Sequence, residues 1–67
     1  MKIIVNQKPI EIEINASLQL LADKIQLSAQ RGIAIAVNNK VIAKKDWSEF
    51  SLKREDKVLV ISASQGG

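Results

Sequence analysis

The chain has 67 residues, 46% of them hydrophobic, and ten lysines and arginines against seven acidic residues give it a net charge of +3. This length accommodates one small domain. The absence of cysteine and histidine excludes disulfides, thiolate metal sites and nucleophilic dyads built on histidine, and so argues against a self-contained enzyme.

The first two segments predict a β-hairpin. Residues 2–6 form a short β-rich run, and residues 6–9 supply turn chemistry with the sequence Asn-Gln-Lys-Pro. Isoleucine and glutamate then alternate strictly over residues 10–14, a period typical of a strand with one wet face. We expect the isoleucines to face inward beside Ile3 and Val5: Ile10, Ile12 and Ile14.

A helix is predicted after the hairpin. Ser17 is a candidate N-cap. One apolar stripe follows at positions i, i+3, i+4 and i+7: Leu18, Leu21, Ala22 and Ile25. We expect this stripe to be core, and the helix to end between Leu27 and Gln30, with Gly32 providing a positive-φ exit.

Two strands joined by a tight turn are predicted next. The first spans residues 33–38, and Asn38-Asn39 turns the chain into a short strand at residues 41–43. Alternate side chains of the first strand would face the helix: Ile35 and Val37. The side chains between them leave the other face small and apolar: Ala34 and Ala36.

The segment before the last strand looks irregular, with one helical turn starting near Asp46 within residues 44–48. Its apolar side chains would close the end of the core: Trp47, Phe50 and Leu52. For a lone tryptophan we favour this structural role over an interface role. A charged turn at residues 53–56 then leads into the last strand, residues 57–62.

These elements predict an α+β fold in which one helix covers one face of a mixed sheet of four to five strands. If Val58 and Val60 face the helix, Leu59 and Ile61 face away from it, together with Ile4 and the two alanines. An apolar sheet face that no helix covers indicates a docking surface. The alternative is a set of scattered surface apolar residues, which is ordinary.

The chain ends on Gly66-Gly67, two of its three glycines. With an average glycine content of about 7%, two terminal glycines occur by chance in roughly 0.5% of chains. Glycine carries no Cβ, so such an end can thread into a narrow cleft and present its carboxylate there. The alternative is an ordinary frayed terminus. We therefore divide the chain into a domain at residues 1–62 and a flexible tail at residues 63–67.

Several other classes of function are disfavoured. The basic residues are scattered, and with one tryptophan, one phenylalanine and no tyrosine there is no platform for stacking bases. No carboxylate cluster has the spacing of a metal site. The apolar run at residues 3–5 is too short for a signal peptide, and no stretch approaches the length of a membrane span. We therefore expect a cytoplasmic protein.

The residues resemble those of the ThiS family, the small sulfur carriers of thiamine biosynthesis with a ubiquitin-like β-grasp fold. The resemblance covers essentially the whole chain. It rests on the short length and on six features: the hairpin turn at Asn6, the segment 36–47 with Trp47, Leu52, the acidic turn at Asp56, the strand 58–61, and Gly66-Gly67. The segment with the tryptophan is the most specific of these features.

The resemblance implies that the protein is a co-substrate and not a catalyst. A ThiF-like adenylyltransferase would use ATP to adenylate the Gly67 carboxylate, and a persulfide donor linked to a cysteine desulfurase would convert it to a thiocarboxylate. A ThiG-like thiazole synthase would then take up the sulfur. Gly66 and Gln65 would thread the tail into these enzymes, Leu59 and Ile61 would contact them, and the chain itself would bind no cofactor.

Three alternatives remain at this stage. The nearest is the small subunit of molybdopterin synthase, which often carries prolines just before its glycines, whereas the single proline of this chain is Pro9. The second is a ubiquitin-like modifier joined to lysines through Gly67. The third is a β-grasp interaction module in which the two glycines have no chemical role.

Overall fold

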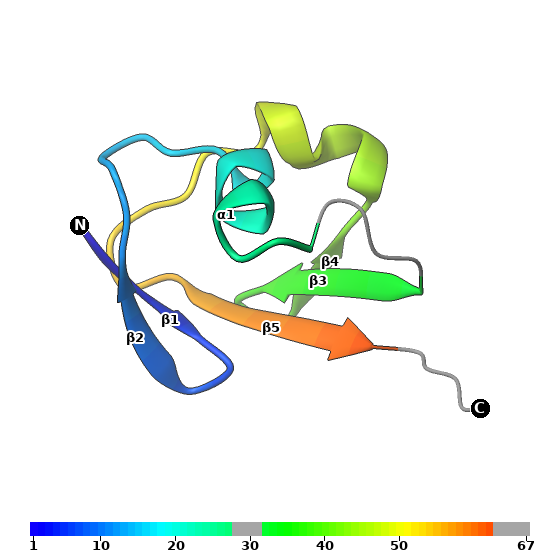
Figure 1. The fold of residues 1–67 in the computed structure, drawn as a ribbon, viewed down its shortest axis with the longest axis horizontal. Helices are drawn as coiled ribbons and strands as arrows, with labels where there is room; N and C mark the ends of the chain where they lie inside the picture. Colours follow the sequence, from blue (N-terminus) through cyan, green and yellow to red (C-terminus); the bar gives the residue numbers. More distant parts are fainter. Residues whose placement is uncertain (28–31, 63–67) are drawn as a thin grey trace.

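The computed structural model describes residues 1–27 and 32–62, and within them the chain forms one five-stranded sheet with one α-helix and one 3₁₀ helix (Figure 1). The elements are β1 (Lys2–Val5), β2 (Lys8–Glu11), α1 (Leu18–Lys24), β3 (Ile33–Val37), β4 (Lys40–Ile42), η1 (Lys44–Glu49) and β5 (Lys57–Ser62). The strand order is β2-β1-β5-β3-β4, with β1 and β5 parallel and the other pairs antiparallel. Both helices lie on one side of the sheet (Figure 1). The predicted α+β architecture is confirmed, and the predicted tail at residues 63–67 lies outside the described residues.

The β1–β2 hairpin turns through two residues with left-handed backbone, Asn6 (φ 49°) and Gln7 (φ 71°). Such a turn matches the twist of the flanking strands, and asparagine tolerates it better than most residues. Because only two residues form the turn, β2 begins at Lys8 and includes Pro9. Pro9 lies opposite Ile4. The Ile4 N–H points away from β2 and donates to the Asp56 carbonyl oxygen at 2.9 Å. The proline nitrogen therefore faces away from β1, where no N–H is needed.

The prediction for Ile14 was wrong. The strict alternation of residues 10–14 predicted a strand through Ile14, whereas β2 ends at Glu11. Ile12 continues the pairing, since its N–H donates to the Met1 carbonyl oxygen at 2.9 Å and its side chain is buried. The chain then turns at Ile14 and Asn15 (φ 66°) to reach the helix, which leaves the Ile14 side chain 63% exposed.

Helix α1 begins as predicted but ends earlier. The Ser17 Oγ accepts a hydrogen bond from the Leu20 N–H at 3.0 Å, which confirms the N-cap. The helix ends at Lys24, and two residues later Gln26 takes a left-handed backbone (φ 65°) that stops the helix from continuing. The Leu27 N–H then donates to the Ala22 carbonyl oxygen at 2.7 Å and the Gln26 N–H to that of Asp23 at 3.1 Å, the pattern of a Schellman cap. Gly32 does have a positive φ (69°), but it is not the exit from this helix.

The core lies between α1, η1 and the face of the sheet that they cover. Three of the four residues of the predicted helical stripe are buried, and the fourth, Ile25, is partly buried against them. As predicted, Ile35, Val37 and Val58 point into this core, and Val60 packs against it. The buried cluster consists of Ile3, Val5, Ile12, Ala16, Leu18, Leu21, Ala22, Ile35, Val37, Ile42, Trp47, Leu52 and Val58.

The segment before the last strand is more regular than predicted. It forms the six-residue 3₁₀ helix η1 instead of a single turn near Asp46. Trp47, on this helix, is almost completely buried, and its indole Nε1–H donates to the Ile42 carbonyl oxygen at 3.0 Å. Leu52 is buried and Phe50 packs against the same core, so the predicted structural role of these three side chains is confirmed. A tryptophan can be buried this fully because its one polar group has a partner.

A small polar network fixes the beginning of β5. Asp56 is buried and accepts two hydrogen bonds, from the Asn38 Nδ2 at 3.0 Å and from the Lys53 backbone N–H at 2.8 Å. The Asn38 Oδ1 in turn accepts from the Lys57 backbone N–H at 3.0 Å. Asn38 and Asn39 form the β3–β4 turn with φ values of 51° and 72°. The network therefore ties this turn to the first residue of β5.

Candidate functional site

The face of the sheet opposite α1 is the candidate docking surface, and we call it the open face. The strand register places on it Ile4, Lys57, Leu59 and Ile61, with Ala34 and Ala36 from β3 and Val41 from β4. Leu59 is 51% exposed and Ile61 42% exposed. The predicted orientation of β5 is therefore confirmed, whereas the docking role of these two residues remains a prediction.

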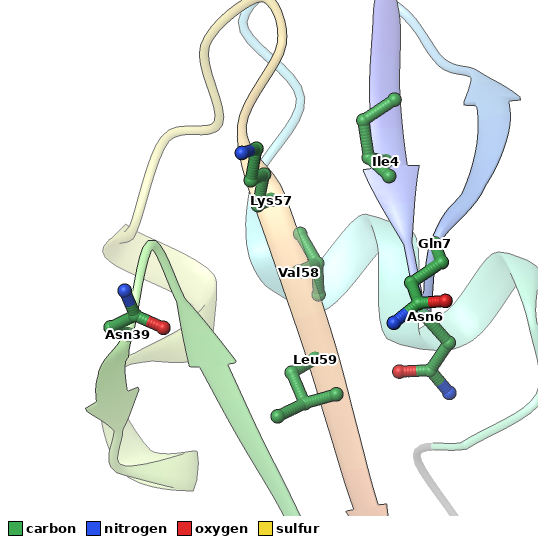
Figure 2. A pocket seen from close by; sticks show the side chains of 7 residues that line it. All are labelled: Ile4, Asn6, Gln7, Asn39, Lys57, Val58 and Leu59. Atoms are coloured by element: carbon green, nitrogen blue, oxygen red, sulfur yellow. The ribbon is translucent and has the colours of Figure 1, made fainter.

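A hollow of about 520 Å³ lies on the open face beside the first half of β5 (Figure 2). Figure 2 shows Lys57, Val58 and Leu59 along β5 in the middle of the view. Ile4 of β1 lies on one side of β5 with Asn6 and Gln7 from the β1–β2 turn, and Asn39 from the β3–β4 turn lies on the other. An apolar floor with an amide rim is a surface that can receive a side chain of a partner protein.

The charge of the hollow comes from Lys57. Within the part of the chain that the structure describes, no acidic side chain forms an ion pair with this lysine. The described lysine ion pairs are exposed and lie elsewhere: Lys2 with Glu55 at 3.8 Å, and Lys45 with Asp46 at 3.3 Å. Lys57 therefore leaves the hollow positively charged, which favours a partner with acidic side chains.

Strand β5 joins the open face to the end of the chain. It is the central strand of the sheet, between β1 and β3, and its last residue is Ser62. In the sequence five residues follow Ser62, including the candidate site residues Gln65, Gly66 and Gly67. These three predicted site residues lie outside the described residues, so their roles stay predictions.

The described residues hold no cluster of metal-ligating side chains. The sequence has no histidine or cysteine, and no group of three or more metal-ligating side chains was found in residues 1–27 and 32–62. None of the helices in these ranges is long and apolar enough to cross a membrane. The described part of the chain provides a surface, and β5 leads from this surface towards the predicted site residues at positions 65–67.

Sequence reasoning missed the role of Asn6. Its side-chain Oδ1 accepts a hydrogen bond from the Val60 N–H at 2.8 Å, and its own N–H donates to the Val58 carbonyl oxygen at 2.9 Å. Asn6 and Val60 are 54 positions apart. The sequence signal for Asn6 was only that of a turn, and nothing local indicates that its amide also holds β5.

Comparison with known proteins gives a family and a fold. The model of the ThiS family matches residues 3–67. A crystal structure of the thiamine biosynthesis protein (ThiS) from Geobacter metallireducens superposes with a TM-score of 0.84 at 19% identity, over all of both chains. A solution NMR structure of a thiamine biosynthesis protein from Geobacter metallireducens gives a TM-score of 0.78 at 19% identity, over all of this chain and 88% of the other. A search of curated proteins found no match. The shared fold is the ubiquitin-like β-grasp, as the sequence predicted.

Proposed function

The chain belongs to the ThiS family, and from this membership we propose that it is a sulfur carrier of thiamine biosynthesis whose Gly67 carboxylate is converted to a thiocarboxylate. The observation that carries the proposal is the extent of the family match, which runs through residue 67 and so includes both glycines. The lack of histidine and cysteine supports the role of a co-substrate on which other enzymes act.

The proposed chemistry begins with the poor reactivity of a carboxylate, which is an anion and resists nucleophilic attack. A ThiF-like adenylyltransferase joins the Gly67 carboxylate to AMP from ATP and releases pyrophosphate. The terminal sulfur of a persulfide donor then attacks the acyl carbon and displaces AMP. This step forms a carbon–sulfur bond to Gly67. A thiol then attacks the donor's inner sulfur, cleaves the donor's own sulfur–sulfur bond and forms a disulfide with the donor, and the thiocarboxylate remains on Gly67 for a ThiG-like thiazole synthase.

The chain's own contribution to this chemistry is access. Gly66 and Gly67 carry no side chains that could clash with the walls of a narrow active site. Gln65 precedes them in the segment that we propose to thread into the enzyme. Because Ser62, the last residue of β5, is five positions before Gly67, the domain would stay outside that cleft, and its open face would be available to contact the enzyme surface.

We assign Leu59 and Ile61 to that contact. Both are exposed although they are apolar, and they lie on the strand that leads to the tail. Lys57, in the hollow beside Leu59, supports a partner surface that combines an apolar patch with an acidic side chain. The same face would serve the adenylyltransferase and the thiazole synthase in turn.

Pyrophosphate release by the ThiF-like adenylyltransferase of the same organism tests both parts of this proposal. The unaltered chain should stimulate release from ATP. Leu59→Lys and Ile61→Lys should raise the chain concentration needed for half-maximal release about tenfold or more, because docking would bury an unpaired ammonium group. Their melting temperatures should change little, since both positions are exposed.

Ile14→Lys is the matched control, because Ile14 is also an exposed isoleucine but lies in the connection between β2 and α1. It should leave the concentration dependence unchanged. Equal weakening by all three variants would contradict the docking assignment, because it would show an effect of added charge alone. No pyrophosphate release with the unaltered chain would contradict the proposed function itself.

A further inference from the structure

The second half of β5 has a free edge on the side of β1. Strand β1 ends at Val5, and the chain turns away at Asn6, whereas β5 continues to Ser62. The Asn6 N–H bonds to the Val58 carbonyl oxygen, and its side-chain Oδ1 accepts from the Val60 N–H at 2.8 Å. The Asn6 amide thus takes the place of one more strand residue and ends the β1–β5 ladder.

The direction of the remaining backbone groups follows from alternation along β5. The carbonyl groups of Asp56 and Val58 accept from β1 and Asn6, whereas the Lys57 carbonyl accepts from Asn38 on the β3 side. Even-numbered residues therefore direct their N–H and C=O groups towards the β1 side. The Val60 C=O and the Ser62 N–H point to this side, and among the described residues no strand lies there. We call these two groups the free edge.

Figure 1 shows the same relation, because the arrow of β5 runs past the β1–β2 hairpin while β3 lies along its other side.

The free edge also lacks the residues that usually protect an edge. The outer strand β2 carries Lys8, Glu11 and Pro9, whose nitrogen offers no donor. Residues 60–62 contain neither a charge nor a proline. Natural proteins use charges and prolines to prevent unwanted pairing, so their absence here favours pairing with a partner.

We propose that an extended segment of the adenylyltransferase pairs with the free edge and adds a short strand to the sheet. The inference rests on the proposed function and names how the enzyme holds the chain. The enzyme backbone would donate to the Val60 C=O and accept from the Ser62 N–H, the mode of recognition known as β-strand addition. The exposed side chains of Leu59 and Ile61 lie on the same strand, so one enzyme element can contact both.

This pairing would also set the register of the tail. Gly67 is five residues beyond Ser62, and five extended residues span about 17 Å. Pairing at Ser62 fixes the direction in which the following residues leave the domain. The enzyme would thereby place the carboxylate at a defined distance from the edge. Fewer additional contacts with residues 63–67 would then be needed to position it.

A second copy of the chain fits the free edge less well. Antiparallel pairing of two β5 strands at Ser62 would place each neighbour's strand alongside the residues that lead to Gly67. Such a dimer would obstruct the residues that the proposed function requires to reach an enzyme active site. The enzyme that acts on the tail is therefore the occupant that we propose.

Ser62→Pro removes the N–H of the free edge, and Ser62→Ala is its matched control because it keeps the N–H and loses the hydroxyl. Proline is compatible with the fold here, since the missing N–H faces away from β3. We expect both variants to keep the melting temperature of the unaltered chain. In titrations with the ThiF-like adenylyltransferase and ATP, Ser62→Pro should bind about threefold to tenfold more weakly than Ser62→Ala.

Amide hydrogen exchange on the unaltered chain tests the inference without any substitution. The Ser62 amide should exchange rapidly in the free protein and become protected when the adenylyltransferase is bound. The Ile61 amide, which points towards β3, should be protected in both states and serves as the internal control.

Three outcomes would overturn the inference. Equal binding by Ser62→Pro and Ser62→Ala, with adenylation of the unaltered chain intact, would refute edge pairing and leave the proposed function standing. Protection of the Ser62 amide through concentration-dependent dimerisation of the free chain would assign the edge to a second copy. Absence of adenylation in the unaltered chain would remove the proposed function, and the inference with it.

Discussion

Extending the chain by one alanine after Gly67 is expected to abolish sulfur acceptance. The added residue moves the carboxylate beyond the point at which adenylation would occur and places a peptide bond at Gly67. It also puts a Cβ where the proposed path accommodates only glycine. The melting temperature should not change, because the buried cluster of the core ends at Val58. The measurement is thiocarboxylate formation with adenylyltransferase, ATP and persulfide donor.

Ser64→Ala is the control for this experiment, since it alters the tail but leaves Gln65, Gly66, Gly67 and the carboxylate in place. It should accept sulfur at close to the rate of the unaltered chain. If the extended chain accepted sulfur as readily as this control, the chemistry could not take place on the Gly67 carboxylate.

Leu21→Ala should destabilise the fold by about 2–5 kcal/mol, because it removes a fully buried side chain and leaves a cavity. A domain of this size has a total stability of only about 3–10 kcal/mol. The Leu21→Ala substitution should therefore remove a large share of the stability of the domain and raise its unfolded fraction at physiological temperature. Urea denaturation followed by circular dichroism measures the change in the free energy of unfolding.

Leu20→Ala makes the same chemical change at the neighbouring position, where the side chain is 39% exposed. It should cost clearly less than Leu21→Ala. If the two substitutions cost the same, the helix would not present Leu21 to the core in solution, and the packing of α1 against the sheet would have to be revised.

Local patterns predicted most of the fold. The apolar stripe after Ser17 predicted the buried face of α1, and the alternation of residues 57–62 predicted which side chains of β5 face the helix. Each of these patterns depends on the periodicity of a single element. The errors came where a neighbouring segment ended an element early. The alternation at Ile14 was interrupted because the chain had to turn towards α1. Helix α1 ended at Lys24 because Gln26 adopted the left-handed backbone expected of a glycine.

The candidate site was predictable only where it depends on the periodicity of a single strand. The exposure of Leu59 and Ile61 follows from alternation along one strand and could be read from the sequence. The hollow beside Leu59 could not, because its lining comes from both tight turns and β5. The free edge depends on the lengths of β1 and β5 and on a hydrogen bond between residues 54 positions apart. Such long-range relations leave no local pattern.

The central claim is that Gly67 carries sulfur, and the mass of the C-terminal fragment of the protein isolated from its native host tests it most directly. Top-down mass spectrometry should show a fragment containing Gly67 in which one oxygen is replaced by sulfur. The fragment is needed because oxidation of Met1 adds nearly the same mass to the intact chain. An unmodified terminus, even after supply of adenylyltransferase, ATP and persulfide donor, would contradict the claim. A fragment joined to a lysine of another protein would instead identify a ubiquitin-like modifier.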